Sequence, residues 1–327
     1  MVQSSVFPTL IDALRTPLTE ADMAGLREAL WAQPKIGSGD IAALFAAKDR
    51  LDPVDPLFSE FLQEAVLHFA LKQDWPRNFL SDANATLLVD LVAKDGRIDA
   101  ETDFELLVRL AEQAEQCPAS FKAFLCREIE AAVLTGKGIT RQGTTLAPRV
   151  VDAADVAYLR RLVFAPGAGG SLKVNFEEAE MLFRIKDATL GAPNDGGWQA
   201  LFVQAIANHL MAYLNYTPRT IEDAARQDAF IADNAPRAGR FLGQMANSFG
   251  SSAFTKLFSK DALVDHASAV ASKHAITVEE AAWLKRQIAH DGKTDDLEKA
   301  LLTFLVDECA PVTDRAAGFN QAASGLS

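Results

Sequence analysis

The sequence is poor in the residues that build disulfide-linked or zinc-stabilised folds. It has three cysteines among 327 residues, at Cys117, Cys126 and Cys309. An odd number of widely spaced cysteines argues against a disulfide framework and against a zinc site. We expect buried, reduced thiols, as is typical of a cytoplasmic protein.

Long apolar runs are absent as well. The sequence has no stretch of about 18 uncharged apolar residues, so we predict no transmembrane helix. The first 17 residues carry Asp12 and Arg15 and lack the apolar run of a signal peptide. Both features favour a cytoplasmic location and no membrane partner.

Basic residues are outnumbered by acidic ones. The chain has 32 Lys and Arg against 44 Asp and Glu, which gives a net charge of −12. Nucleic-acid binding and binding to anionic membranes both depend on clustered Lys and Arg. We therefore expect neither as a partner. An acidic surface suits solubility, cations or a basic protein partner.

Familiar catalytic motifs are missing too. The sequence contains no Gly-rich phosphate loop followed by Lys-Ser/Thr, no Gly-x-Ser-x-Gly and no His-Glu-x-x-His. We predict that the protein is not an enzyme. An enzyme with its site between two halves of the chain is the least favoured of three hypotheses.

Internal repetition is the most informative feature that is present. Residues 151–216 resemble residues 18–71 at three places. The matched segments are Asp22–Arg27 with Asp155–Arg160, Leu44–Asp49 with Leu182–Asp187, and Phe61–His68 with Phe202–His209. Each copy shows helical spacing of apolar residues in three segments. We predict helices over residues 20–31, 38–48 and 56–71, and over residues 153–164, 176–189 and 196–215.

A second repeat follows the first. Residues 85–99 align without a gap onto residues 281–295. The order of copies predicts a tandem duplication of a six-helix unit. The first pair of copies is offset by 138 residues (Lys48 to Lys186) and the second by 196 (Asp95 to Asp291). The difference, 196 − 138 = 58 residues, indicates an insertion before the last repeat.

Helix-start signals occur at matching places in the copies. A capping residue stands three positions before an acidic one, so that each side chain can bond the other's backbone N–H. The pairs are Thr19 with Asp22, Asp152 with Asp155, Asn175 with Glu178, Thr277 with Glu280, and, more weakly, Gly37 with Asp40.

These patterns predict an all-α, internally duplicated helical repeat protein with two related six-helix halves and a helical insertion. Short amphipathic helices must be covered by neighbouring repeats. The predicted divisions are a lead-in (1–17), a first half (18–136), a second half (151–310) containing the insertion (217–275), and a tail (311–327). Phe7, Leu10, Ile11 and Leu14 predict a short docked helix in the lead-in.

The insertion carries a row of large apolar residues. Phe241, Met245 and Phe249 lie four apart on one helix face, and Phe254 and Phe258 continue the spacing. Three interpretations remain open: packing on the repeats, contact with a partner or second copy, and a membrane-surface helix. The polar face lacks the Lys and Arg density that membrane-surface helices usually show.

Two Asp-Gly loops are candidate cation sites. Their acidic residues are Asp95 and Asp99 in the first copy, and Asp291, Asp295 and Glu298 in the second. Calcium needs six to eight oxygen ligands, which is more than these loops offer. A structural interpretation competes: the Gly makes the turn, and the later Asp caps the next helix.

A helix, an Asp-Gly-x-Ile turn, an acidic capping residue and a Leu-rich helix together resemble the tellurite-resistance B-type (TerB-like) all-helical domain. The similarity covers Ala85–Leu110 and, less closely, Ala281–Leu305. The family is associated with stress responses and metal-linked functions. The resemblance implies an all-helical fold, and a divalent cation is the one cofactor it suggests.

Matching histidines and Lys-Asp pairs also recur, as His68 with His209 and as Lys48-Asp49 with Lys186-Asp187. We expect core histidines and contacts between helices rather than ligands or a catalytic pair. The leading functional hypothesis is a non-enzymatic scaffold that binds a protein partner, which the charge suggests is basic. The alternative is a TerB-like cation-binding stress-response protein.

Overall fold

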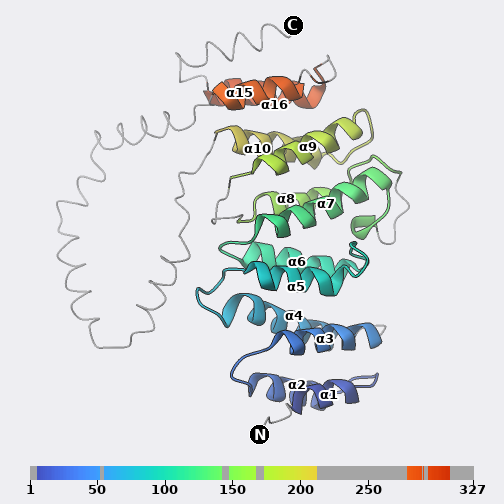
Figure 1. The fold of residues 1–327 in the computed structure, drawn as a ribbon. Coiled ribbons are helices and arrows are strands. Elements are labelled where there is room, and N and C mark those ends of the chain that lie inside the picture. The colour runs from blue at the N-terminus through green and yellow to red at the C-terminus, as the bar shows by residue number, and fades with distance from the viewer. Residues whose placement is uncertain are drawn as a thin grey trace, which may run out of the picture. The chain divides into compact units, whose positions relative to one another are not determined.

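A computed structural model describes residues 6–51, 55–141, 147–166, 173–211, 278–288, 290 and 294–309 (Figure 1). These residues form 12 α-helices and no strand, which confirms the all-α prediction. No described helix is long and apolar enough to cross a membrane. The described residues divide into two compact units, residues 6–166 and residues 173–309, hereafter unit 1 and unit 2.

Unit 1 is a stack of helix pairs (Figure 1). Each helix packs on its neighbour in sequence or on the next but one, as α1 packs on α2 and α3, and α6 on α7 and α8. The α-helices are α1 (Val6–Ala13), α2 (Glu20–Trp31), α3 (Ser38–Arg50), α4 (Pro56–Leu67), α5 (Asp82–Val92), α6 (Glu101–Gln113), α7 (Ala119–Thr135) and α8 (Ala153–Val163). A π-helical turn, His68–Lys72, extends α4, and a 3-10 turn, Ile139–Arg141, precedes α8.

Unit 2 contains α9 (Phe176–Ala188), α10 (Gly197–Met211), α15 (Val278–Ile288) and α16 (Asp296–Cys309). Helix α10 packs on both α9 and α16. Trp283 of α15 is nearly buried and lies edge-on to Phe183 and His209, with ring centroids 5.6 and 4.9 Å away. This aromatic cluster joins α15 to α9 and α10, which are distant in sequence.

Three of the five predicted capping pairs are confirmed. Thr19, Asp152 and Asn175 each form reciprocal capping bonds with the acidic residue three positions later. At Gly37 only half of the motif exists, since the Asp40 carboxylate accepts from the Gly37 N–H at 2.8 Å and glycine has no side chain to return the bond. Thr277 lies outside the described residues.

Helix lengths deviate slightly from the prediction. The segment predicted as one helix over 56–71 is α-helical only to Leu67 and then widens into the π-helical turn. The lead-in forms the predicted short helix, and Phe7, Ile11 and Leu14 are buried. Burial of each such side chain stabilises the fold by about 1.5–3 kcal/mol.

The two compact units do not coincide with the predicted halves. Helix α8 belongs to unit 1, whereas the sequence repeat places it at the start of the second half. Repeats stack on their neighbours, so the densest contacts need not follow the repeat boundary. The duplication itself stays a prediction.

A buried lysine links α7 to the chain just after α8. The Lys122 ammonium of α7 is buried and donates to the Ala165 carbonyl, just beyond the end of α8, at 2.8 Å.

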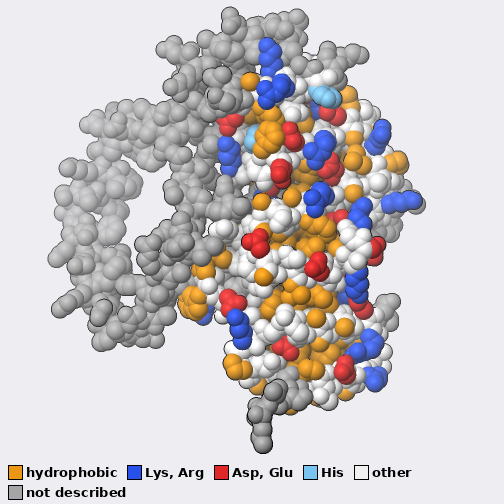
Figure 2. All heavy atoms as spheres, viewed as in Figure 1, with side chains coloured by type: hydrophobic (Ala, Val, Ile, Leu, Met, Phe, Trp, Pro, Cys, Tyr) orange, Lys and Arg blue, Asp and Glu red, His pale blue; other side chains and the backbone are white. Residues whose placement is uncertain are grey.

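On the outer surface of unit 1, apolar side chains gather over α3 and α5 among charged ones (Figure 2). Leu87 and Leu91 of α5 are half-buried. Small apolar areas interrupted by charged side chains are normal on protein surfaces.

Candidate functional site

A buried ion-pair cluster surrounds Lys186 in unit 2. Its ammonium bonds Glu298, Asp295 at 2.7 Å and Asp187 at 2.9 Å. Burial disfavours the charged ammonium, but the hydrogen bonds to these carboxylates outweigh it and raise the pKa of Lys186. Burial also disfavours the charged form of Glu298 and so raises the pKa of that carboxyl, although the charge and hydrogen bond of Lys186 oppose this.

Unit 1 has a smaller cluster of the same kind. Lys48 of α3 bonds Asp103 of α6, and Lys94 bonds Asp49. Lys48 and Lys186 are each the eleventh residue of their helices, and Asp103 and Glu298 are each the third. In each unit the lysine therefore joins its own helix to a later helix, through an acidic residue at the third position of that helix.

The candidate cation ligands of the second Asp-Gly loop have other partners. Asp295 and Glu298 cap the start of α16 reciprocally, and both bind the Lys186 ammonium. A cation at these carboxylates must therefore displace a buried lysine. Asp291 lies outside the described residues.

In the first Asp-Gly loop, Asp95 and Asp99 are exposed, and Asp95 accepts from the Arg97 N–H. Gly96 has a φ of 84°, which confirms the predicted glycine turn. The cap predicted at Asp99 is wrong. Helix α6 begins at Glu101 after Ala100, which makes no side-chain cap. Asp295, by contrast, directly precedes α16 and caps it. Across the described part of the chain, no group of three His, Cys, Asp or Glu is arranged to hold a metal.

The matching histidines lie against aromatic rings. His209 is buried and its Nδ1 lies 2.8 Å from the Val174 carbonyl oxygen. His68 is half-buried and lies edge-on to Trp31 at 4.7 Å. Burial lowers the pKa of both. These environments agree with the expected packing role.

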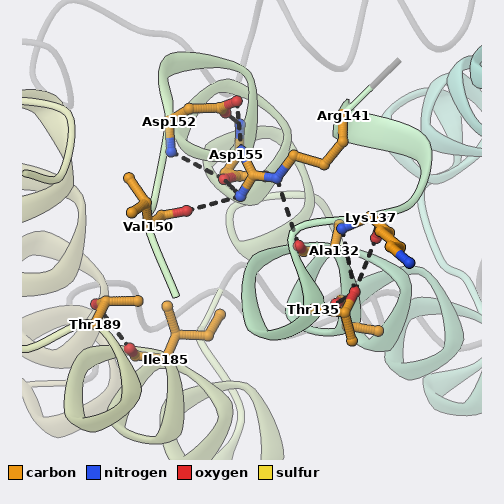
Figure 3. Close-up of polar contacts among 10 residues, drawn as sticks. Ala132, Thr135, Lys137, Arg141, Val150, Asp152, Asp155, Ile185 and Thr189 are labelled. Atoms are coloured by element: carbon orange, nitrogen blue, oxygen red, sulfur yellow. Dashed lines mark hydrogen bonds and ion pairs between the residues drawn. The ribbon is translucent and has the colours of Figure 1, made fainter. Parts of the chain in front are cut away.

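A second charged network of unit 1 surrounds Arg141, near the start of α8 (Figure 3). The Arg141 guanidinium donates to Asp152 at 2.5 Å, to Asp155 at 2.6 Å and to the Val150 carbonyl at 2.7 Å. Burial is the largest influence on Asp155 and raises its pKa to about 6, although the backbone bond from Asp152 and the charge of Arg141 oppose this. Arg141 therefore fastens the residues before α8 to its first turn.

An open groove of about 600 Å³ lies between α10 and α16 of unit 2. One wall carries Gln199, Val203 and Gln204, and the other carries Ala300, Thr303 and Phe304. Gln199, Gln204 and Thr303 are exposed, and Phe304 is half-buried. The lining thus combines apolar surface with uncharged hydrogen-bonding groups. No described side chain of the groove carries a charge.

In unit 1 the helix position that matches Phe304 carries a charged residue, Arg109. Gln63 and Gln204 are each the eighth residue of their helices, α4 and α10, while Arg109 and Phe304 are each the ninth residue of α6 and α16. In unit 1 the Arg109 guanidinium donates to Gln63 Oε1 at 2.9 Å and so bridges α4 and α6. Unit 2 has a phenyl ring in place of that bridge.

The residues predicted to bind a partner, Phe241, Met245, Phe249, Phe254 and Phe258, all lie outside the described residues. The sequence did not indicate the groove, because its walls come from helices about a hundred positions apart. No protein-family model, curated protein or solved structure matches the chain. The functional proposal therefore depends on the geometry of the residues alone.

Proposed function

We propose that the protein is a non-enzymatic interaction protein that holds a protein partner in the groove between α10 and α16. The proposal rests on the half-buried Phe304 and the exposed Gln199, which line the same open groove. Protein interfaces gain most of their affinity from a few buried anchors surrounded by polar contacts. The groove offers both kinds of group.

The charged clusters support a structural role for the buried ions of both units. Arg141 and Lys186 each hold two or more carboxylates within their own unit. Such clusters fix helix positions, and removing one partner leaves an uncompensated buried charge. The Lys186 cluster holds α16, which forms one wall of the groove, against α9.

The test is site-specific crosslinking in cells that produce the protein. A photoreactive benzophenone side chain replaces Gln199 or Thr303, which are exposed and line the groove. Leu190, an exposed apolar residue of unit 2 outside the groove lining, is the control position. We expect both groove positions to capture the same protein and the control to miss it.

A further substitution separates specific from accidental capture. Ala200 is exposed and lines the groove, so Ala200→Arg adds bulk and charge there without disturbing the core. We expect it to abolish the crosslinks. Identical adducts at all three probe positions, or adducts that survive Ala200→Arg, would contradict the proposed function.

A further inference from the structure

We infer that the groove between α10 and α16 receives an amphipathic helix of the partner, with large apolar side chains facing Phe304 and basic residues on its flanks. This inference rests on the proposed function and specifies the partner's binding element. It is drawn from how unit 1 covers the corresponding helix, α6.

In unit 1 a helix lies on α6. Tyr158 of α8 packs edge-on against Phe104 of α6, with centroids 5.1 Å apart. Arg161 of α8 bonds Glu105 at 2.6 Å and Glu112 at 2.7 Å, both on α6. The covering element is therefore a helix that offers one aromatic side chain and one arginine on the same face, three residues apart.

Helices α6 and α16 carry different kinds of side chain at the same positions counted from the helix start. The fifth residue of each helix is Glu105 in α6 and Ala300 in α16, and the ninth is Arg109 and Phe304. The charges of Glu105 and Arg109 thus have apolar counterparts in α16. A helix that covers α16 needs apolar groups where α8 offers Arg161, because a charge facing Ala300 and Phe304 would lose water without gaining a partner.

The length of the groove determines how many turns of the partner helix can contact it. The α10 wall runs from Gly196 to Gln204, which spans about 12 Å at the helical rise per residue. This length corresponds to about two helical turns, so apolar anchors at i, i+4 and i+7 would meet the wall. Gln199, which is exposed, can bond polar groups beside that apolar stripe.

The backbone of the groove walls favours a helix over an extended peptide. Both walls are helices, whose internal N–H and C=O groups are already bonded within the helix. Neither wall offers the free strand edge that an extended peptide needs for strand addition. The chain carries a net charge of −12, which favours Lys and Arg among the partner residues that flank the groove.

The test uses displayed peptides of about 16 residues, a length at which isolated helices begin to be stable. Random peptides are selected on the intact chain, and the best are synthesised and measured by calorimetry. We expect selected sequences to share apolar residues at helical spacing. Phe304→Arg, which copies the residue of unit 1, and Ala200→Arg should each weaken binding by about tenfold or more. Leu190→Arg should leave it unchanged.

A central proline separates helical from extended binding, since it breaks a helix. We expect the proline peptide to lose about tenfold or more in affinity. Selected peptides without helical spacing, or peptides indifferent to both the proline and Ala200→Arg, would overturn the inference. If groove crosslinks to a partner persist in that case, the proposed function stands and only the helical partner fails.

Two other occupants give distinct results. If deletion of residues 311–327 increases peptide affinity by about tenfold, the chain's own tail occupies the groove, and the inference is overturned. A dimer in light scattering that Phe304→Arg dissociates would assign the groove to a second copy and would also overturn it. Ala200→Arg serves where Phe304→Arg lowers the yield of folded protein, as circular dichroism would show.

Discussion

Lys186 and Glu298 form an ion pair in which each side chain is only 1% exposed. The two residues stand on α9 and α16, 112 positions apart in sequence. A buried pair of this kind adds little net stability over an apolar pair, but breaking it is costly.

Lys186→Met should therefore destabilise the protein strongly. The substitution keeps the apolar stem and leaves the two buried carboxylates, Asp295 and Glu298, without their cation. We expect the free energy of unfolding to fall by about 3 kcal/mol or more in urea titrations. Lys299→Met is the matched control, because Lys299 is 63% exposed in its pair with Asp296 and exposed pairs contribute about 0–1 kcal/mol. Equal effects of the two substitutions would contradict the structural role of Lys186.

Asp155 should make stability depend on pH. Its folded pKa of about 6 lies above the ordinary value of 3.8, so the folded state holds the proton more tightly than the unfolded state. This residue therefore costs stability as pH rises from about 4 to 6, by roughly 2–3 kcal/mol in all. Asp155→Asn should remove that cost. The difference in unfolding free energy between variant and wild type should grow across this range.

The control is the corresponding capping residue of α2, Asp22. Hydrogen bonds from Thr19 lower the pKa of Asp22, so its contribution has the opposite sign and is lost as pH falls. Asp22→Asn should not reproduce the pH trend of Asp155→Asn. Parallel pH curves for wild type and Asp155→Asn would show that Asp155 titrates normally.

Arg161 should link α6 and α8 measurably. It bonds two carboxylates, Glu105 and Glu112, while 29% exposed. Arg161→Ala should cost about 1 kcal/mol, and the double-mutant cycle with Glu105→Ala should give a coupling energy near 0.5–1 kcal/mol. A coupling of zero would mean that the pair is fully screened by solvent.

Calcium and zinc titrations test the cation-binding alternative. Since Lys186 already neutralises Asp295 and Glu298, we expect no micromolar heat from either ion. A micromolar heat that Asp291→Ala abolishes would instead support the loop as a cation site. That result would favour the stress-response hypothesis over a scaffold.

Local signals in the sequence predicted most of the described helices. Thr19 and Asp152 mark helix starts because capping bonds involve residues only three apart. The single misplaced cap, at Asp99, has an identifiable cause: one additional residue, Ala100, stands before α6, although Asp99 and Asp295 align in the repeat. An alignment that ended at Asp99 could not show this shift.

The groove could not be predicted for a different reason. Its properties come from Phe304 on α16 lying near Gln204 on α10, and no periodicity within either helix specifies that neighbour. The exchange of Arg109 for Phe304 is visible only after both helices are numbered from their observed starts. Long-range packing, and not local propensity, decides this surface.

The hydrogen bond from Lys122 to the Ala165 carbonyl constrains how the sequence of α7 can change in evolution. An insertion or deletion of one residue between Lys122 and the buried Leu125 would rotate this ammonium by about 100° relative to the rest of α7 and carry it away from the Ala165 carbonyl. The buried charge would then be stranded in apolar surroundings. Divergent relatives of this chain should therefore tolerate substitutions at the exposed Ala119 and Ser120 while conserving the spacing from Lys122 to the buried residues of α7.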